Sequence, residues 1–299
     1  MQMRKIIPGE LPTKDFHQFM LGTVAPRPIG FVSTIDAEGN PNLAPFSFFN
    51  AFSSNPPIVV FSSNRRIGDN TTKDTLANIR ATGECVINSV SYGIVRQMAV
   101  CSVDYPKDVS EFTKSGLTPI PSEYVKPYRV KESHSHMECR VRDVITLGEH
   151  GGAGHLIVCD VLCIHLDEAV IDDRGRIDPD KMDLMGRMGR AYYVRASGES
   201  IHAVPQAYNK IPVGYDNLPE SIRLSKYLSG NHIGLLAGML EFPDKNMIQE
   251  IAQDPVVQEM ISQKDLAGLH QRAAQFLDQV EVAQAAVILL IADRLYHSR

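Results

Sequence analysis

Short segments rich in β-branched and aromatic residues alternate with turn residues from the start of the chain to about Ser197. Ile29–Ile35 is one such segment, and Asp36–Asn40 after it has the Asp, Gly and Asn of a hairpin turn, so a second strand is expected near Asn42. Further strands are expected at Ile58–Ser63, Cys85–Val90, Met137–Leu147 and His155–Leu166. The last is apolar on both faces and is expected in the middle of a sheet. Many short strands of this kind are typical of a β-barrel or β-sandwich.

Helical patterns are few in this half of the chain and dominate after it. Asp69–Thr72 offers good N-cap residues, and the helical stretch that follows should end at Gly83. From Leu218 onward the sequence is predominantly helical, and the stretch before it is rich in Pro, Gly and Tyr. We therefore expect a β domain over residues 1–197, a connector over 198–217 and a helical C-terminal extension over 218–299.

Charge and hydropathy exclude several functional classes. The chain has 30 Lys and Arg against 35 Asp and Glu, so it lacks the basic character of a nucleic-acid-binding protein. Its longest apolar run, Ala285–Ala292, is far shorter than the ~18 residues of a membrane span, and its first residues lack the apolar core of a signal peptide. The five cysteines have no CxxC spacing and are expected to be reduced. We expect a cytoplasmic protein that binds neither nucleic acid nor membrane.

Several motifs, in a fixed order, carry a resemblance to a known family. They are APRPIGFVST (25–34), NLAPFSFFN (42–50), KDTLANI (73–79), MECRV (137–141), GHLIVCDVLCIHLDEAV (154–170) and MGRAYY (188–193). Over roughly residues 10 to 197 the chain resembles the flavin reductase-like family. The resemblance implies an FMN-binding split β-barrel of Greek-key type, a few helices, and a homodimer with the flavin at or near the subunit interface.

The same residues have the chemistry that an FMN site needs. FMN has a phosphate dianion and a planar ring with a polar edge, so it requires an anion cradle and an apolar slot with hydrogen-bonding groups. Hydroxyls and cations near strand ends suit the phosphate, as does the helix that Lys73–Thr75 should open. The stretch Asn42–Asn50, including Phe48, suits the ring. The predicted FMN-binding residues are Arg27, Pro28, Ser33, Thr34, Asn42, Ala44, Pro45, Phe46, Ser47, Phe49, Asn50, Ser62, Ser63, Arg65, Lys73, Asp74 and Thr75.

Taken singly, these residues also fit a purely structural interpretation, in which the phenylalanines form barrel core and the hydroxyls cap turns. The order of the motifs favours the FMN site. For catalysis we select Arg27, as a positive group near flavin N1 and C2=O, and His155, because family members have a Gly-x-His near the nicotinamide or flavin face. The match at His155 is imperfect, since Cys159 stands where many relatives have glycine. A surface arginine and a structural histidine are the alternatives.

His134, His136 and Glu138 alternate along an expected strand and would face one side, as metal ligands can. No second cluster with zinc-like spacing accompanies them. We therefore expect no metal and treat these residues as ordinary members of a strand.

Three functional hypotheses follow. The first is an FMN-dependent oxidoreductase of the NAD(P)H:flavin reductase type, which transfers hydride from NADH or NADPH to bound FMN. The second is a flavoredoxin-like electron carrier that a partner protein reduces, and the third is a flavin-free binding protein. The sequence does not identify the electron acceptor, choose between NADH and NADPH, distinguish a tightly bound cofactor from an exchangeable one, or assign a role to residues 218–299. The apolar stretch Val282–Ile291 should be covered, either by the barrel or in a dimer contact.

Overall fold

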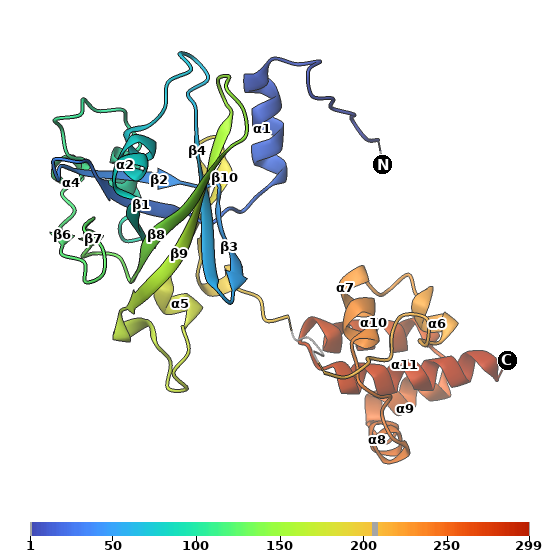
Figure 1. Cartoon of the computed structure of the whole chain (residues 1–299). Helices are drawn as coiled ribbons and strands as arrows, with labels where there is room; N and C mark the ends of the chain where they lie inside the picture. The colour runs from blue at the N-terminus through green and yellow to red at the C-terminus, as the bar shows by residue number, and fades with distance from the viewer. Residues whose placement is uncertain (1, 205–208, 299) are drawn as a thin grey trace. The chain divides into compact units, whose positions relative to one another are not determined.

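The computed structural model of the protein describes residues 2–204 and 209–298. The chain divides into two compact units, Met1–His202 and Ala203–Arg299, and Figure 1 shows a β-rich first unit and a helical second one. The boundary falls inside the expected connector 198–217, of which residues 205–208 lie outside the described residues.

The first unit contains all the strands that Figure 1 draws. They are β1 (Gly30–Ile35), β2 (Pro41–Phe46), β3 (Phe49–Ser54), β4 (Pro57–Asn64), β5 (Glu84–Asn88), β6 (Pro119–Ile120), β7 (Arg129–Val130), β8 (Ser135–Thr146), β9 (Gly154–Leu166), β10 (Leu184–Gly189) and β11 (Tyr192–Ala196). Its helices are α1 (Thr13–Thr23), α2 (Asp74–Thr82), α3 (Val95–Val100), α4 (Glu111–Ser115) and α5 (Pro179–Met182), with 3₁₀ turns at Glu168–Val170 and Gly198–Ser200.

Seven of these strands form one antiparallel sheet in the order β2-β1-β5-β8-β9-β4-β3. The strands expected from the sequence near Asn42, at Ile58, Cys85, Met137 and His155 are confirmed as β2, β4, β5, β8 and β9. The expected interior position of β9 is also confirmed, because β8 pairs with it on one side and β4 on the other.

The sheet curls so that strands near its two edges share one core. Phe46 of β2 and Phe61 of β4 are far apart in the strand order, yet their ring centroids lie 5.0 Å apart. Around them pack buried side chains from β1, β5, β8, β9 and α2. Helices α3 and α4 contribute to a second apolar cluster, which includes Phe31 of β1 and Leu43 of β2.

Helix α2 has its N-cap at Lys73, one residue after the expected N-cap residues Asp69–Thr72. Lys73 makes no side-chain capping bond, and Asp69–Thr72 is wrong as a cap. The expected end is confirmed: Gly83 adopts φ +70°, a left-handed conformation that glycine accepts without steric cost. Several elements of the first unit were not predicted from the sequence, among them α1, α3, α4, α5, the short strands β6 and β7, and the β10–β11 hairpin.

The second unit is helical, as expected. Its helices are α6 (Glu220–Arg223), α7 (Gly230–Ala237), α8 (Lys245–Ile251), α9 (Pro255–Ser262), α10 (Leu266–Asp278) and α11 (Val282–His297). The apolar stretch of α11 is buried against helices of its own unit, with Leu236, Leu269 and Leu277 among its neighbours in one core. Across the described residues, no helix combines the length and hydrophobicity that crossing a membrane requires.

Candidate functional site

A cavity of about 390 Å³ opens in the first unit where α1, the end of β2, the end of β4 and the β10–β11 hairpin meet. This volume lies within the usual range of small-molecule sites, roughly 300–1,000 Å³. Five cationic side chains line it, and none of the described lining residues is Asp or Glu. They are Arg27, Arg65, Arg66, Lys73 and Arg187. The cavity therefore has the electrostatic character of a site for an anion.

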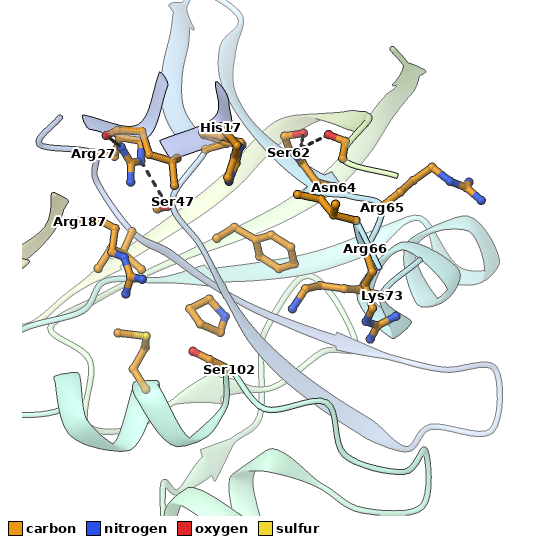
Figure 2. Close-up of a pocket in the computed structure, with 18 of the residues that line it drawn as sticks. His17, Arg27, Ser47, Ser62, Asn64, Arg65, Arg66, Lys73, Ser102 and Arg187 are labelled. Atoms are coloured by element: carbon orange, nitrogen blue, oxygen red, sulfur yellow. Dashed lines mark hydrogen bonds between the residues drawn. The ribbon is translucent and has the colours of Figure 1, made fainter. Parts of the chain in front are cut away.

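The cations form two groups on opposite sides of the cavity, as Figure 2 shows. Arg65, Arg66 and Lys73 lie on the side where β4 ends and α2 begins. The Arg65 guanidinium donates to the side chain and carbonyl of Asn70, both at 2.7 Å. Arg66 donates to both carboxylate oxygens of Asp104, at 2.9 and 2.7 Å, and this ion pair raises the pKa of Arg66 and lowers that of Asp104.

Lys73 is the third cation on this side. Its ammonium lies 5.9 Å from the centroid of the Phe46 ring, and Figure 2 shows it directed toward the middle of the cavity. Ser62 and Asn64 are close by on β4, where the Ser62 hydroxyl donates to Asn64 Oδ1 at 2.8 Å. Hydroxyl and amide groups beside cations at a helix start are the elements of a phosphate site.

Arg27 and Arg187 form the second group, and the backbone holds them together. They make an isolated antiparallel bridge in which Arg27 N–H donates to Arg187 C=O at 3.0 Å and Arg187 N–H donates to Arg27 C=O at 2.8 Å. Arg27 is only 4% exposed, yet its Nη2 has no hydrogen-bond partner among the described residues. Burial, with the nearby charge of Arg187, lowers the pKa of Arg27.

The wall between the two groups is largely aromatic. Pro45, Phe46 and Phe48 line it, with Ser47 accepting from Arg27 Nε at 3.4 Å. The Phe48 ring meets the His17 ring edge-to-face at 6.2 Å. Burial, followed by the charge of Arg27, lowers the pKa of His17. A planar ligand can lie on this wall with a cationic group at either end.

The structure brings part of the predicted FMN set into this cavity. Seven predicted residues line it: Arg27, Pro45, Phe46, Ser47, Ser62, Arg65 and Lys73. Pro28, Phe49 and Asn50 line an adjoining apolar cavity of about 300 Å³, which also includes Arg27, Ser47 and Ser62.

Seven other predicted residues lie outside both cavities. Asn42 and Asp74 line a separate hollow of about 180 Å³. Thr34 and Thr75 are buried and accept hydrogen bonds from Asn42, at 3.3 and 3.0 Å. Ala44 is part of the core, and the buried Ser33 and Ser63 hydroxyls lack a partner among the described residues. Asn42 and Phe46 are four residues apart on one strand, roughly 13 Å at ~3.3 Å per residue, so both ends of β2 cannot contact one ring.

His155 also lies outside the cavity. It is 2% exposed, with Nδ1 within 3.0 Å of Thr146 Oγ1 and Nε2 buried without a partner in the described structure. Burial, followed by the charges of Arg80 and Arg65, lowers its pKa. This environment is that of a neutral, buried histidine.

Several lining residues were missed from the sequence. They are His17 and Leu21 of α1, Asn64, Arg66, Ile67, Met98, Ser102, Gly152 and Arg187, together with Ile29 and Tyr193, which the motifs contained. Phe48, which was expected beside the ring, does line the cavity. A second arginine next to Arg65 was a usable signal for Arg66. Arg187 directly precedes the MGRAYY motif and Tyr193 is its last residue, but no local pattern showed that their hairpin would reach Arg27.

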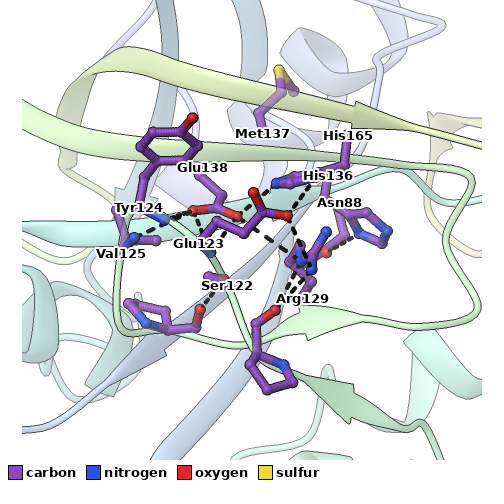
Figure 3. Close-up of polar contacts among 12 residues, drawn as sticks. Asn88, Ser122, Glu123, Tyr124, Val125, Arg129, His136, Met137, Glu138 and His165 are labelled. Carbon is purple, nitrogen blue, oxygen red and sulfur yellow. Dashed lines mark hydrogen bonds and ion pairs between the residues drawn. The ribbon is translucent and has the colours of Figure 1, made fainter.

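The three residues weighed as metal ligands have other partners. Glu138 is fully buried and accepts backbone N–H groups from Glu123, Tyr124 and Val125, as Figure 3 shows. Its carboxylate is also 2.7 Å from His165 Nε2. His136 Nδ1 lies 2.9 Å from Asn88 Oδ1, and His134 Nδ1 lies 3.0 Å from Asp167. Within residues 2–204 and 209–298, no three His, Cys, Asp or Glu side chains converge as metal ligands.

Comparisons with known proteins agree with this geometry. The family model described as flavin reductase like domain matches residues 21–179. An uncharacterized protein of Aquifex aeolicus is 39% identical over 183 residues, which are 61% of this chain and 91% of that protein. The crystal structure of nitrilotriacetate monooxygenase component B from Bacillus cereus is 32% identical, with a TM-score of 0.63 over 68% of this chain and all of that one.

A Shewanella frigidimarina protein with a split barrel domain is 26% identical, with a TM-score of 0.57 over 66% of this chain and 94% of that one. The curled seven-stranded sheet is accordingly a split barrel, as expected from the sequence, and the helical unit lies beyond the match to the family model.

Proposed function

The chain belongs to the flavin reductase-like family, and from this premise we propose that it is an FMN-dependent oxidoreductase of the NAD(P)H:flavin reductase type. In this proposal it passes a hydride from a nicotinamide to bound FMN. The observation that carries the proposal is the cavity itself, with five cations, no carboxylate among its described lining residues and an aromatic wall between two cationic groups.

The residues present fit FMN. The buried Arg27 Nη2 lacks a partner in the described part of the chain, and a cofactor oxygen would satisfy it. Lys73 and Arg65, with the Ser62 hydroxyl, would hold the phosphate at the start of α2. Pro45, Phe46 and Phe48 would support the ring, which leaves its polar edge toward Arg27.

FMN, when bound, supplies the redox chemistry by accepting and passing on the two electrons of a hydride. The protein's own contribution is orientation and charge. Arg27 would favour the reduced cofactor, because negative charge at the pyrimidine edge of the ring is stabilised by a preorganised cation. His17 and Ser102 would add an imidazole and a hydroxyl to the lining.

A second candidate function is a flavoredoxin-like electron carrier that a partner protein reduces. The position of His155 favours it, since this residue is buried outside the cavity and offers no group to a nicotinamide. Both functions use the same FMN site and differ only in the electron donor.

We also expect a homodimer. Several apolar side chains of the first unit are strongly exposed, among them Phe52 at 68%, Leu147 at 61% and Ile164 at 60%. A subunit contact would cover exposed apolar side chains of this kind. We base the expected dimer on membership of the family.

The deciding experiment is the visible spectrum of the purified protein, reconstituted with FMN, before and after anaerobic NADH or NADPH. We expect a protein-bound flavin band that the nicotinamide bleaches. Arg27→Gln should bind FMN at least about tenfold more weakly, since a hydrogen bond to a charged group is worth ~1.5–3 kcal/mol. Arg176→Gln, a change at a 65% exposed side chain on a distant loop, should leave binding unchanged.

The outcomes separate the candidates. A bound flavin that stays oxidised with both nicotinamides, but is bleached by a reduced electron-transfer protein, favours the carrier. A protein that takes up no FMN overturns both functions.

A further inference from the structure

Arg27 and Arg187 face each other across an antiparallel bridge with both backbone hydrogen bonds formed. Residues paired in this way have Cα atoms about 5.5 Å apart and direct their side chains to the same face. Both side chains line the same cavity, and Figure 2 shows them on the same side of it. Like charges directly opposite each other in a sheet are destabilising.

No acidic side chain offsets this pair within the described lining of the cavity. Arg27 donates to the carbonyls of Leu21 and Val24, and Arg187 donates to the Tyr193 hydroxyl and the Arg190 carbonyl. All four acceptors are uncharged. A guanidinium has five N–H donors, so Arg187 keeps donors free after these two contacts.

FMN, in the proposed orientation, does not use every positive charge in the cavity. Its phosphate carries about −1.5 to −2 charge at neutral pH, which Lys73 and Arg65 would balance. Asp104 already balances Arg66 at 2.7 Å. Arg27 would serve the polar edge of the ring. Arg187, next to Arg27, then remains as one positive charge that no group of FMN balances.

We infer that Arg187 binds an anionic oxygen group, a carboxylate or a phosphate, on the second substrate, the molecule that exchanges electrons with the cofactor. This inference rests on the proposed function, since it assumes FMN in the same cavity. Arg187 is a specificity-determining residue in this view. The Tyr193 ring, 4.6 Å from the Arg187 guanidinium, adds an aromatic surface, so the preferred substrate is planar and carries the anion at its edge.

The two sources of such an anion are the nicotinamide donor, through its phosphate, and an aromatic acceptor, through a carboxylate. Matched probe pairs distinguish them: nicotinamide mononucleotide against nicotinamide riboside, and benzoate against benzamide. Each pair differs only in the anionic group. Binding to the oxidised, FMN-loaded, full-length protein is measured by titration calorimetry and by perturbation of the flavin spectrum.

Arg187→Gln should weaken the anionic member of one pair by about tenfold or more and change its neutral counterpart by less than about twofold. Arg187→Lys, which keeps the positive charge, should recover part of the affinity for the anionic probe. Such a recovery would show that the weaker binding of Arg187→Gln is not caused by a folding defect. Arg190→Gln is the matched control, because Arg190 lies on the same hairpin but lines a different cavity. It should bind all four probes like the wild type.

Three results would overturn the inference: neither anionic probe binds more tightly than its neutral partner, the variant weakens both members of a pair equally, or it releases FMN. The last would make Arg187 a cofactor ligand. If the wild-type protein takes up no FMN, the proposed function itself is wrong. A spectrum without a flavin band identifies that case.

Discussion

At the scale of single residues, the surroundings of His136 strongly disfavour its charged form. It is 7% exposed, and its Nδ1–H donates to Asn88 Oδ1 at 2.9 Å. Burial, followed by the charges of Arg129 and His165, lowers its pKa to about 4, while the nearby Glu138 acts in the opposite direction. His136 is therefore neutral in the folded protein at neutral pH.

This residue makes stability depend on pH. The unfolded chain binds the proton with the ordinary pKa of 6.5 and the folded one with about 4, so between these values the unfolded state carries more protons. The free energy of unfolding should therefore fall as the pH is lowered from 6.5 toward 4, by up to about 3 kcal/mol. Urea unfolding of His136→Gln at several pH values should give a shallower fall than the wild type. His150→Gln, at an exposed histidine, serves as the control, and an equal slope in all three proteins would refute the assignment.

Residue chemistry was easier to predict than residue position. Phe46, Ser62 and Lys73 line the cavity as expected, because their types suit a ring and a phosphate. Thr34 has an equally suitable hydroxyl, yet it is buried and accepts from Asn78 at 3.1 Å. The sequence shows which side chains could bind a ligand. It does not show which end of each strand faces the cavity, because that depends on how the sheet closes.

At the scale of elements, β9 and β4 approach each other at their cavity ends through a glycine. A Cβ on Gly154 would lie 2.6 Å from Ser62 Oγ and 3.3 Å from Asn64 Oδ1. Both side chains line the cavity. Because Gly154 has no side chain, the Ser62 hydroxyl can occupy the space beside it.

Gly154→Ala should displace Ser62 and break its 2.8 Å hydrogen bond to Asn64. We expect FMN affinity to fall several-fold and the free energy of unfolding to fall by ~1–3 kcal/mol, as for other overpacked sites. Gly93→Ala is a fair control, since its Cβ would meet nothing closer than 3.6 Å. Flavin titration and urea unfolding measure the two effects, and unchanged FMN affinity in Gly154→Ala would contradict the role given to Ser62.

Two of the missed elements, α1 and the β10–β11 hairpin, share a physical cause. Helix α1 has no buried residue, and β10–β11 is a separate two-stranded sheet. β4 was identified from an apolar run and α2 from the cap residues and the glycine that flank it, whereas no comparable signal was identified for α1 or the hairpin. Contacts between distant parts of the chain, such as the bridge between Arg27 and Arg187, position them. Local patterns do not contain that information.

At the scale of the whole molecule, the two units have separate cores. Every residue that lines the FMN-sized cavity lies between His17 and Tyr193, within the first unit. The apolar face of α11, which was expected to be covered by the barrel or in a dimer contact, is buried among helices of the second unit.

A chain that ends at His202 should therefore fold and bind FMN within about threefold of the full-length affinity. The first unit keeps its whole core and every cavity residue. Flavin titration measures affinity, and light scattering after size exclusion compares the oligomeric state of the two chains. A shortened protein that folds but loses FMN would assign the helical unit a part in the site, and one that becomes monomeric would assign it the subunit contact.

The place of the β10–β11 hairpin in the chain has a consequence for biosynthesis. Arg187 and Tyr193 complete the cavity wall, and the helical unit starts only at Ala203. Chains are made from the N-terminus at ~5–20 residues per second, so translation of the last hundred or so residues takes roughly 5–20 s. In the later part of that interval, once the hairpin has left the ribosome, the nascent first unit has every residue that lines the cavity. FMN bound at that stage would stabilise a barrel whose strands pair over long sequence distances, before the rest of the protein exists.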